Sequence, residues 1–426
     1  MRWLLNAVYI AVAAVVAPLA IVRYLRTGKP VAEPWAKLTG RLDLPPLDRP
    51  IWIHAVSVGE VLQVRPLVDA LRGRDPTVEI VITASTASGL RVASEKYEDC
   101  VVAPLPFDFS WAVDTAIARV RPREIVLVEL ELWPNLLVTA ARRGIPVSVV
   151  SGRLSERSHR GYRRVRGLVR PLLRTLTHVG SQTRAYADRF RDLGALPGRV
   201  RVTGCLKHDV LANPSAESVT SLRRSFGIAD TETALIAGST HTPEEQIVLD
   251  AYSTLRVRHS NLRLILVPRH PERFDEVAGQ IEAAGFGVAR RSDTSHAERD
   301  SVGLLDTVGE LAACWRLADV AFVGGSLTDR GGQNMLEPAA AGAAVLFGPN
   351  VWNFPRESAG LLDAGGAVQL ADADSLAAEI DALLSDRDAM EAVAIAGRRF
   401  AQSLSGAADA EAARLVPSSN ASRRAA

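Results

Sequence analysis

A chain of 426 residues is too long for one ordinary hydrophobic core and indicates two domains. Hydrophobic residues make up 47% and charged residues 23%, which excludes a disordered protein, and a net charge of +2 gives no reason to expect nucleic-acid binding. Cys100, Cys205 and Cys314 stand apart, without a CxxC pair or a Cys/His cluster, so we expect neither a disulfide framework nor a structural zinc site. A reducing compartment fits this cysteine usage.

The N-terminus carries an uncharged run over residues 3–22, and these 20 residues would span about 30 Å as a helix, the thickness of one bilayer core. Only Arg2 precedes the run and three basic residues follow it, which favours an uncleaved anchor over a cleaved signal peptide. We therefore expect a single-pass transmembrane anchor over residues 1–30. The positive-inside rule then places the rest of the chain on the cytoplasmic side.

After a proline-containing linker, short β-branched runs alternate with helix-like stretches, as in parallel sheets that are buried on both faces. Two such series predict an α/β protein with two Rossmann-like domains and a central cleft. We expect an N-terminal domain over 31–205, a C-terminal domain over 206–415 that closes with one or two helices, and a disordered tail over 416–426. The predicted strands are Ile51–His54, Val78–Thr83, Cys100–Ala103, Ile125–Val128, Val147–Val150, Ala234–Ala237, Leu262–Val267, Val320–Val323 and Ala344–Phe347.

Polar residues that directly follow these strands are the candidate site residues, because ligands bind beyond the carboxyl ends of parallel strands. Glu60 stands in the first turn of a helix after Ser57 and Gly59. Its carboxylate is either a general base toward a sugar hydroxyl or a simple complement to the helix dipole. Glu129 and Glu131 follow the fourth strand beside a Trp-Pro turn, where a solvated loop is the alternative to a functional role.

An arginine-rich stretch from Arg153 to Arg174 contains eight arginines and one acidic residue, Glu156. Apolar residues recur in it at helical spacing, which predicts an amphipathic helix. Such a helix can lie on anionic lipid or pack against the core, and both can hold for different faces.

The second half of the chain carries features of a nucleotide site. Arg269 follows the strand over 262–267, where its guanidinium can bind a phosphate or carboxylate. Two glycine-rich loops, 324–326 and 331–334, allow close approach of the backbone to a ligand. Glu337 in the following helix can accept hydrogen bonds from ribose hydroxyls.

Seven segments together resemble the 3-deoxy-D-manno-octulosonic acid (Kdo) transferases. They run in the family's order from about Trp52 to Phe354, and the N-terminal anchor belongs to the same pattern. The segments are HAVSVGE, ELELWPN, GRLSERS, VTGCLKHD, AGSTHTPEE, LVPRHPERF and GGSLTDRGGQNMLEP. The resemblance implies a two-domain glycosyltransferase fold (GT-B) and inverting transfer of Kdo from CMP-Kdo to a hydroxyl of the lipid A precursor at the cytoplasmic face of the inner membrane. It implies neither a cofactor nor a metal ion, and no nucleic-acid partner.

The resemblance also implies roles for particular residues. Glu60 takes the position of the general base, while Glu129 and Lys207 take positions of transition-state stabilisation, with Glu131 as the alternative second carboxylate. Gln333, Cys205 and His208 depart from the family's usual residues, as does Met335, which indicates a divergent member. CMP binding carries over to Pro268, Arg269, Gly309, Glu310, Leu311, Asn334, Met335, Leu336 and Glu337.

Three alternatives stand beside this interpretation. A GT-B transferase with a different donor or acceptor is the nearest. A sugar-nucleotide epimerase of the same fold would not need the anchor. A catalytically inactive binding protein would be favoured by the loss of Glu60 or Arg269, and both are present.

Overall fold

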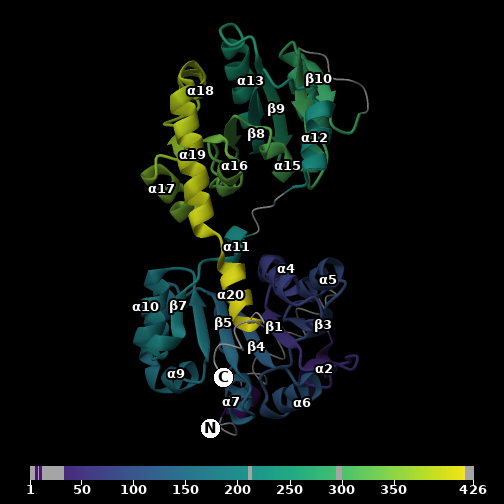
Figure 1. Ribbon diagram of the computed structural model, residues 1–426, viewed down its shortest axis with the longest axis vertical. Helices are drawn as coiled ribbons and strands as arrows, with labels where there is room; N and C mark the ends of the chain where they lie inside the picture. Colours follow the sequence, from purple (N-terminus) through teal and green to yellow (C-terminus); the bar gives the residue numbers. More distant parts are fainter. Residues whose placement is uncertain (1–4, 8, 12–32, 210–213, 294–299, 418–426) are drawn as a thin grey trace. The chain divides into compact units, whose positions relative to one another are not determined.

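The computed structural model describes residues 5–7, 9–11, 33–209, 214–293 and 300–417. The chain forms two compact units, Met1–Val210 with Ser405–Ala426 and Leu211–Leu404, which Figure 1 shows with their elements labelled. Within the described ranges, no helix is both long and apolar enough to cross a membrane. The predicted anchor over residues 3–22 lies mostly outside those ranges.

The first unit is built on a seven-stranded parallel sheet with the strand order β3-β2-β1-β4-β5-β6-β7. Strands β1, β2, β5 and β6 are buried along their whole length, so their sequences show no alternation between core-facing apolar residues and exposed polar ones. The strands are β1 Ile51–Ala55, β2 Ile80–Ala84, β3 Val101–Pro104, β4 Glu124–Val128, β5 Val147–Gly152, β6 His178–Ser181 and β7 Val200–Val202.

Helices cover both faces of this sheet. One face packs against α6, α7, α9 and α10, and the other against α3, α4, α5 and α20. The helices of the unit are α2 Pro34–Thr39, α3 Val58–Gln63, α4 Arg65–Arg74, α5 Ala87–Lys96, α6 Ser110–Val120, α7 Pro134–Arg142, α8 Glu156–Arg164, α9 Arg166–Leu173, α10 Arg184–Leu193, α11 Leu206–Asp209 and α20 Ala407–Leu415.

The last helix, α20, returns to the first unit, whereas the sequence placed everything over 206–415 in the second domain. α20 packs against α4, as Figure 1 also shows, and its residues belong to the core of the first unit. The backbone N–H groups of Gly406 and Ala408 donate to the carboxylate of Asp209 in α11, which caps the start of α20. The apolar face of α20 is therefore buried against the first sheet, and the boundary predicted at 205/206 falls a few residues before the boundary between the units.

The second unit repeats the architecture with the strand order β10-β11-β9-β8-β12-β13-β14, again all parallel. Its strands are β8 Thr233–Thr240, β9 Leu262–Pro268, β10 Gly287–Arg290, β11 Ser301–Leu304, β12 Val320–Val323, β13 Ala344–Phe347 and β14 Ala367–Gln369. Its helices are α12 Ala216–Ser225, α13 Glu244–Leu255, α14 Phe274–Ala283, α15 Leu311–Trp315, α16 Leu336–Ala341, α17 Pro355–Asp363, α18 Leu376–Ser385 and α19 Arg387–Leu404, with short 3-10 turns at Pro197–Arg199 in the first unit and Pro271–Arg273 in this one.

All nine predicted strands are present, with boundaries that differ by no more than a few residues, and the central β12 and β13 match the prediction residue for residue. Five further strands were not predicted: β6, β7, β10, β11 and β14. Each has only three or four residues, and β7, β10 and β14 are edge strands. Short strands with glycine and serine, such as HVGS in β6, carry too little hydrophobic signal to be recognised.

Candidate active site

The carboxyl ends of β1 and β4 bring the first group of candidate residues together. These two strands are hydrogen-bonded neighbours, with Ile51 opposite Glu124 and His54 opposite Leu127. The strand order reverses direction between them, which is the topological switch point where parallel sheets bind ligands. The turn after β1 leads to Glu60, and the turn after β4 contains Glu129 and Glu131.

Glu60 lies in the first turn of α3 and takes part in capping that helix. Ser57 is the N-cap and its Oγ accepts from the Glu60 backbone N–H, while the Val56 N–H donates to Glu60 Oε2 at 2.7 Å. The Ser57 hydroxyl also donates to Glu60 Oε1 at 3.2 Å. A carboxylate has about four lone-pair sites, so these two bonds leave it free to accept a further proton or hydrogen bond. The helix-end role and a role as base are therefore compatible.

Glu129 forms an ion pair with Lys207. The two side chains come from the turn after β4 and from α11, and Lys207 Nζ lies 3.1 Å from Glu129 Oε1. Gln63 Nε2 donates to the same oxygen at 3.3 Å. Glu129 has a φ of 61°, in the left-handed region that side chains other than those of glycine rarely adopt, so the fold holds this residue in an unfavourable backbone conformation.

We call Glu60, Glu129 and Glu131 the carboxylate cluster. Among them, Glu131 has a strongly raised pKa. Burial, together with the neighbouring charges of Glu60 and Glu129, raises the pKa of Glu131 to about 7. Burial also raises the pKa of Glu60, and the charge of Glu129 acts in the same direction. The sequence left open whether Glu129 or Glu131 is the second carboxylate, and the structure gives the ion pair with Lys207 to Glu129.

Asp108, which the sequence analysis did not single out, binds the start of the helix that follows the turn with Glu129 and Glu131. Its two carboxylate oxygens accept hydrogen bonds from the backbone N–H groups of Asn135 and Leu136, both at 2.9 Å. These are the first-turn donors of α7, the helix that directly follows the Glu129–Trp133 turn. Burial raises the pKa of Asp108 to about 6, and the hydroxyl of Tyr9 donates to it at 2.9 Å. An acid in the loop before α6 has no sequence signature that would reveal a partner 27 residues later.

In the second unit, Arg269, Asn334 and Glu337 form the other candidate group. Arg269 directly follows β9, and its backbone N–H donates to the carbonyl of Thr240 at the end of the neighbouring β8. Burial raises the pKa of Glu337, and the positive charge of Arg269 opposes that shift, so the two side chains are electrostatic neighbours. Asn334 Nδ2 donates to Glu337 Oε1 at 3.0 Å and fixes the orientation of that carboxylate.

The other residues predicted to bind CMP fall into three groups. Glu310 is committed to an ion pair, because Arg291 binds its carboxylate at 2.9 Å and holds the pKa of Glu310 below its usual value. Met335 and Leu336 are almost fully buried in the core of the second unit. Their side chains therefore have packing roles, and the Leu336 backbone N–H donates to Asn334 Oδ1 at 3.1 Å. The remaining positions are Pro268 at the end of β9, Gly309 with a φ of 95°, and Leu311 at the start of α15.

The backbone N–H groups of the first glycine-rich loop, 324–326, which was expected to allow close approach to a ligand, bind a carboxylate of the chain itself. The fully buried carboxylate of Glu244 accepts the backbone N–H groups of Gly325, Ser326 and Leu327 at 2.7–3.0 Å. It also accepts the N–H of His241 at 2.9 Å. An internal carboxylate thus takes the place that an anionic ligand would need. The sequence showed Glu244 only as an acid in the first turn of a helix.

The edge of the second sheet beside Arg269 is rich in nitrogen donors. The rings of His241 and His270 meet edge to face with centroids 5.2 Å apart. Burial lowers the pKa of His241, and the positive charges of His270, Arg330 and Arg269 lower it further. A cluster of this composition is suited to hold the phosphate of a nucleotide.

Comparisons with known proteins show which proteins this chain is similar to. Residues 29–210 match a family model described as 3-Deoxy-D-manno-octulosonic-acid transferase (kdotransferase). The 3-deoxy-D-manno-octulosonic acid transferase of Bordetella pertussis is 35% identical over 374 residues, covering 85% of this chain and 86% of that protein. The enzyme of the same name from Haemophilus influenzae is 34% identical over 362 residues, covering 84% of each chain. A solved UDP-GlcNAc 2-epimerase from Neisseria meningitidis shares the fold with a TM-score of 0.57 at 12% identity, covering 87% of this chain and 100% of that chain.

The raised pKa of Glu131 predicts a pH-dependent stability. A carboxyl whose pKa is about 7 in the fold and 4.5 ordinarily stabilises the fold while it is protonated, and this contribution is lost as the pH rises through that interval. We expect Glu131→Gln to raise the melting temperature at pH 8 by about 1–3 °C and to change it little at pH 4.5. Thermal unfolding at both pH values measures this, with the exposed Glu156→Gln as control. An equal effect of Glu131→Gln at both pH values would contradict the assignment.

Proposed function

We propose that this chain, a member of the 3-deoxy-D-manno-octulosonic acid (Kdo) transferase family of glycosyltransferases, moves Kdo from CMP-Kdo to a hydroxyl of the lipid A precursor. The proposed transfer inverts the anomeric centre. Its two parallel α/β units have the GT-B-like fold. The observation that carries the proposed chemistry is the carboxylate cluster with Lys207 at the carboxyl ends of β1 and β4.

Glu60 is the proposed general base. As the acceptor oxygen attacks the anomeric carbon of Kdo, its hydroxyl proton passes to the Glu60 carboxylate. A carbon–oxygen bond forms to the acceptor, the bond from the anomeric carbon to the phosphate oxygen breaks, and CMP leaves with that electron pair. Displacement in one step from the opposite side inverts the anomeric centre and needs no covalent intermediate on the enzyme.

Glu129 and Lys207 are the proposed electrostatic partners of this step. Lys207 Nζ contacts the Glu129 carboxylate at 3.1 Å. The Glu129 carboxylate is proposed to favour the positive charge that builds on the sugar in the transition state. The ammonium of Lys207 is half exposed, with 48% of its side chain accessible, and is proposed to stabilise the departing phosphate.

The proposed donor site lies in the second unit. Arg269 binds the CMP phosphate, and Glu337, oriented by Asn334, accepts hydrogen bonds from the ribose hydroxyls. Pro268, and the backbone of 309–311 and 334–336, complete the proposed contacts.

The inner membrane is the proposed location, with the catalytic units on the cytoplasmic side and an N-terminal anchor over residues 3–22. The arginine-rich stretch forms two helices, α8 and α9, that meet at Val165. Val169, Leu172 and Leu173 pack into the core, whereas Val165 and Leu168 are 47% and 66% exposed among the arginines. One face of this stretch therefore packs against the core, as one of the two interpretations of the sequence expected. The outer face, with exposed apolar residues among arginines, is proposed to bind anionic lipid.

Transfer of labelled Kdo tests the reaction and the base together. With CMP-Kdo generated in the assay and a bis-phosphorylated lipid A precursor in micelles, we expect Glu60→Gln to lower turnover by about 10²–10⁴-fold at unchanged CMP affinity. Ser57→Ala is the matched control, since it weakens the cap of α3 by about 1 kcal/mol but keeps the carboxylate. Near-normal turnover of Glu60→Gln would refute the base. No product from a folded wild-type enzyme that binds CMP would assign the chain another donor or acceptor.

Arg269→Ala tests the donor site. We expect the dissociation constant for CMP, measured by calorimetry, to rise by about tenfold or more, because a charge-assisted hydrogen bond to phosphate is lost. Arg258→Gln, which changes an exposed arginine after α13, is expected to leave CMP affinity unchanged. Unaltered affinity in Arg269→Ala would move the nucleotide elsewhere.

Vesicle binding tests the outer face of α8 and α9. We expect the full chain to bind anionic vesicles more tightly than neutral ones, with a preference that falls with salt. Replacing Arg157, Arg160 and Arg164 by glutamine should abolish this preference, while Arg142→Gln on α7 should not. A preference that survives the triple change would refute the role of this face.

A further inference from the structure

The N-terminal segment binds the start of α6 through a buried amide. Residues 5–7 and 9–11 are helical, and Asn6 is only 3% exposed although it stands in a long apolar run. Asn6 Nδ2 donates to Ser110 Oγ at 2.7 Å, and Asn6 Oδ1 accepts from the Ser110 backbone N–H at 3.0 Å. Ser110 is the first residue of α6, where backbone N–H groups have no partner within the helix, so Asn6 supplies one.

The same side chain reaches the start of α7. Asn135, the second residue of that helix, is 1% exposed, and its Nδ2 donates to Asn6 Oδ1 at 3.3 Å. Asn135 Nδ2 also donates to the backbone carbonyl of Asp108. One amide of the N-terminal segment therefore joins the first residues of two helices, α6 and α7.

Tyr9 contributes a second contact, three residues after Asn6 and therefore on the same side of a helix. Its hydroxyl donates to Asp108 Oδ2 at 2.9 Å, and its ring meets Phe109 edge to face with centroids 6.1 Å apart. Asp108 in turn accepts two first-turn N–H groups of α7. Tyr9 thus binds the carboxylate that holds the start of α7.

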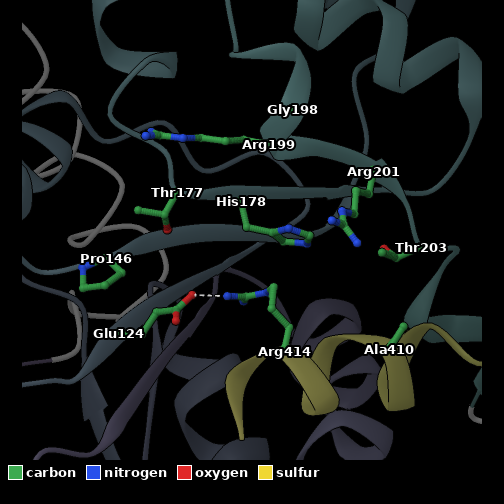
Figure 2. A pocket seen from close by; sticks show the side chains of 10 residues that line it. All are labelled: Glu124, Pro146, Thr177, His178, Gly198, Arg199, Arg201, Thr203, Ala410 and Arg414. Carbon is green, nitrogen blue, oxygen red and sulfur yellow. Dashed lines mark hydrogen bonds and ion pairs between the residues drawn. The ribbon is translucent and has the colours of Figure 1, made fainter. Parts of the chain in front are cut away.

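The start of α7 is important because the turn with Glu129 and Glu131 ends there. β4 leads into this turn, and Figure 2 shows Arg414 of α20 beside Glu124 at the amino end of β4, where the two form an ion pair at 2.7 Å. Glu129 itself has an unfavourable φ of 61°, and such a conformation persists only where the surrounding structure fixes it. The turn is therefore fixed through β4 on one side and through the start of α7 on the other.

We propose that Asn6 and Tyr9 are positioning residues for the carboxylate cluster, so that the N-terminal segment supports the reaction besides its proposed attachment to the membrane. They act through Asn135 and Asp108 on the start of α7, which fixes where the turn over 129–133 ends. On the side that carries Asn6 and Tyr9, the segment contacts protein and not lipid. The inference rests on the proposed function of this turn, and it adds two residues outside the sheet edge to the support of that site.

Kinetics of Kdo transfer in detergent micelles test the proposal with the full chain. Asn6→Ala removes the bridging amide, and Tyr9→Phe removes only the hydroxyl and keeps the ring against Phe109. We expect each change to lower kcat by about tenfold at unchanged KM and CMP affinity, because the residues of the turn are proposed to act on the transition state. Ile10→Ala, which shortens a side chain that is 54% exposed in the same segment, should leave kcat unchanged. A merely structural contact would lower the melting temperature without lowering kcat.

Hydrogen–deuterium exchange gives a second readout that does not need Kdo transfer. We expect the amides at the start of α7 to exchange about tenfold faster in Asn6→Ala and in Tyr9→Phe, and at the wild-type rate in Ile10→Ala. Unchanged exchange in the first two variants, or unchanged kcat in folded variants of an active wild type, would overturn the inference and leave the proposed function standing. A wild type that makes no Kdo product would instead contradict the proposed function, and faster exchange in the two variants would still support the hold of Asn6 and Tyr9 on the turn.

Discussion

The pairing of β1 with β4 is the constraint on which the chemistry of the first unit depends. Their backbone hydrogen bonds fix a register in which His54 lies opposite Leu127, so both strands end at the same edge of the sheet. The segments that leave these ends carry Glu60 on one side and Glu129 on the other, although 69 residues separate them in the sequence. No side-chain interaction is needed to gather the carboxylates, because the sheet holds them together before any ligand arrives.

Gathering three carboxyls at one edge costs free energy, and the chain offsets only part of that cost. Lys207 neutralises Glu129 by direct contact, and Ser57 with the Val56 N–H stabilises the Glu60 carboxylate. Glu131 forms no ion pair with any described residue, and burial together with the charges of Glu60 and Glu129 raises its pKa to about 7. The cluster therefore contains one carboxyl that exchanges a proton near neutral pH, which is typical of acid–base sites.

The periodicity of the sequence was sufficient for the central strands, because fully buried strands such as β12 and β13 consist of apolar residues from end to end. It was insufficient for α20, whose assignment to the first unit depends on the cap from Asp209 and on contacts with α4. The same contrast holds for the site. The position of Glu60 and Glu129 after strands could be foreseen from topology, whereas the buried partners of Asp108 and Glu244 depend on distant backbone N–H groups that leave no local pattern.

Glu244 shows why a glycine-rich loop alone does not identify a phosphate site. Consecutive backbone N–H groups at 325–327 form an anion-binding nest, and the fold fills it with its own carboxylate. Burial raises the pKa of Glu244, while the N–H groups of Gly325, Leu327 and His241 oppose that shift, and these hydrogen bonds give the side chain a structural role. The N–H groups of 325–327 are therefore not available to an external phosphate. Arg269, with His241 and His270 beside it, is the place where the second sheet offers nitrogen donors instead.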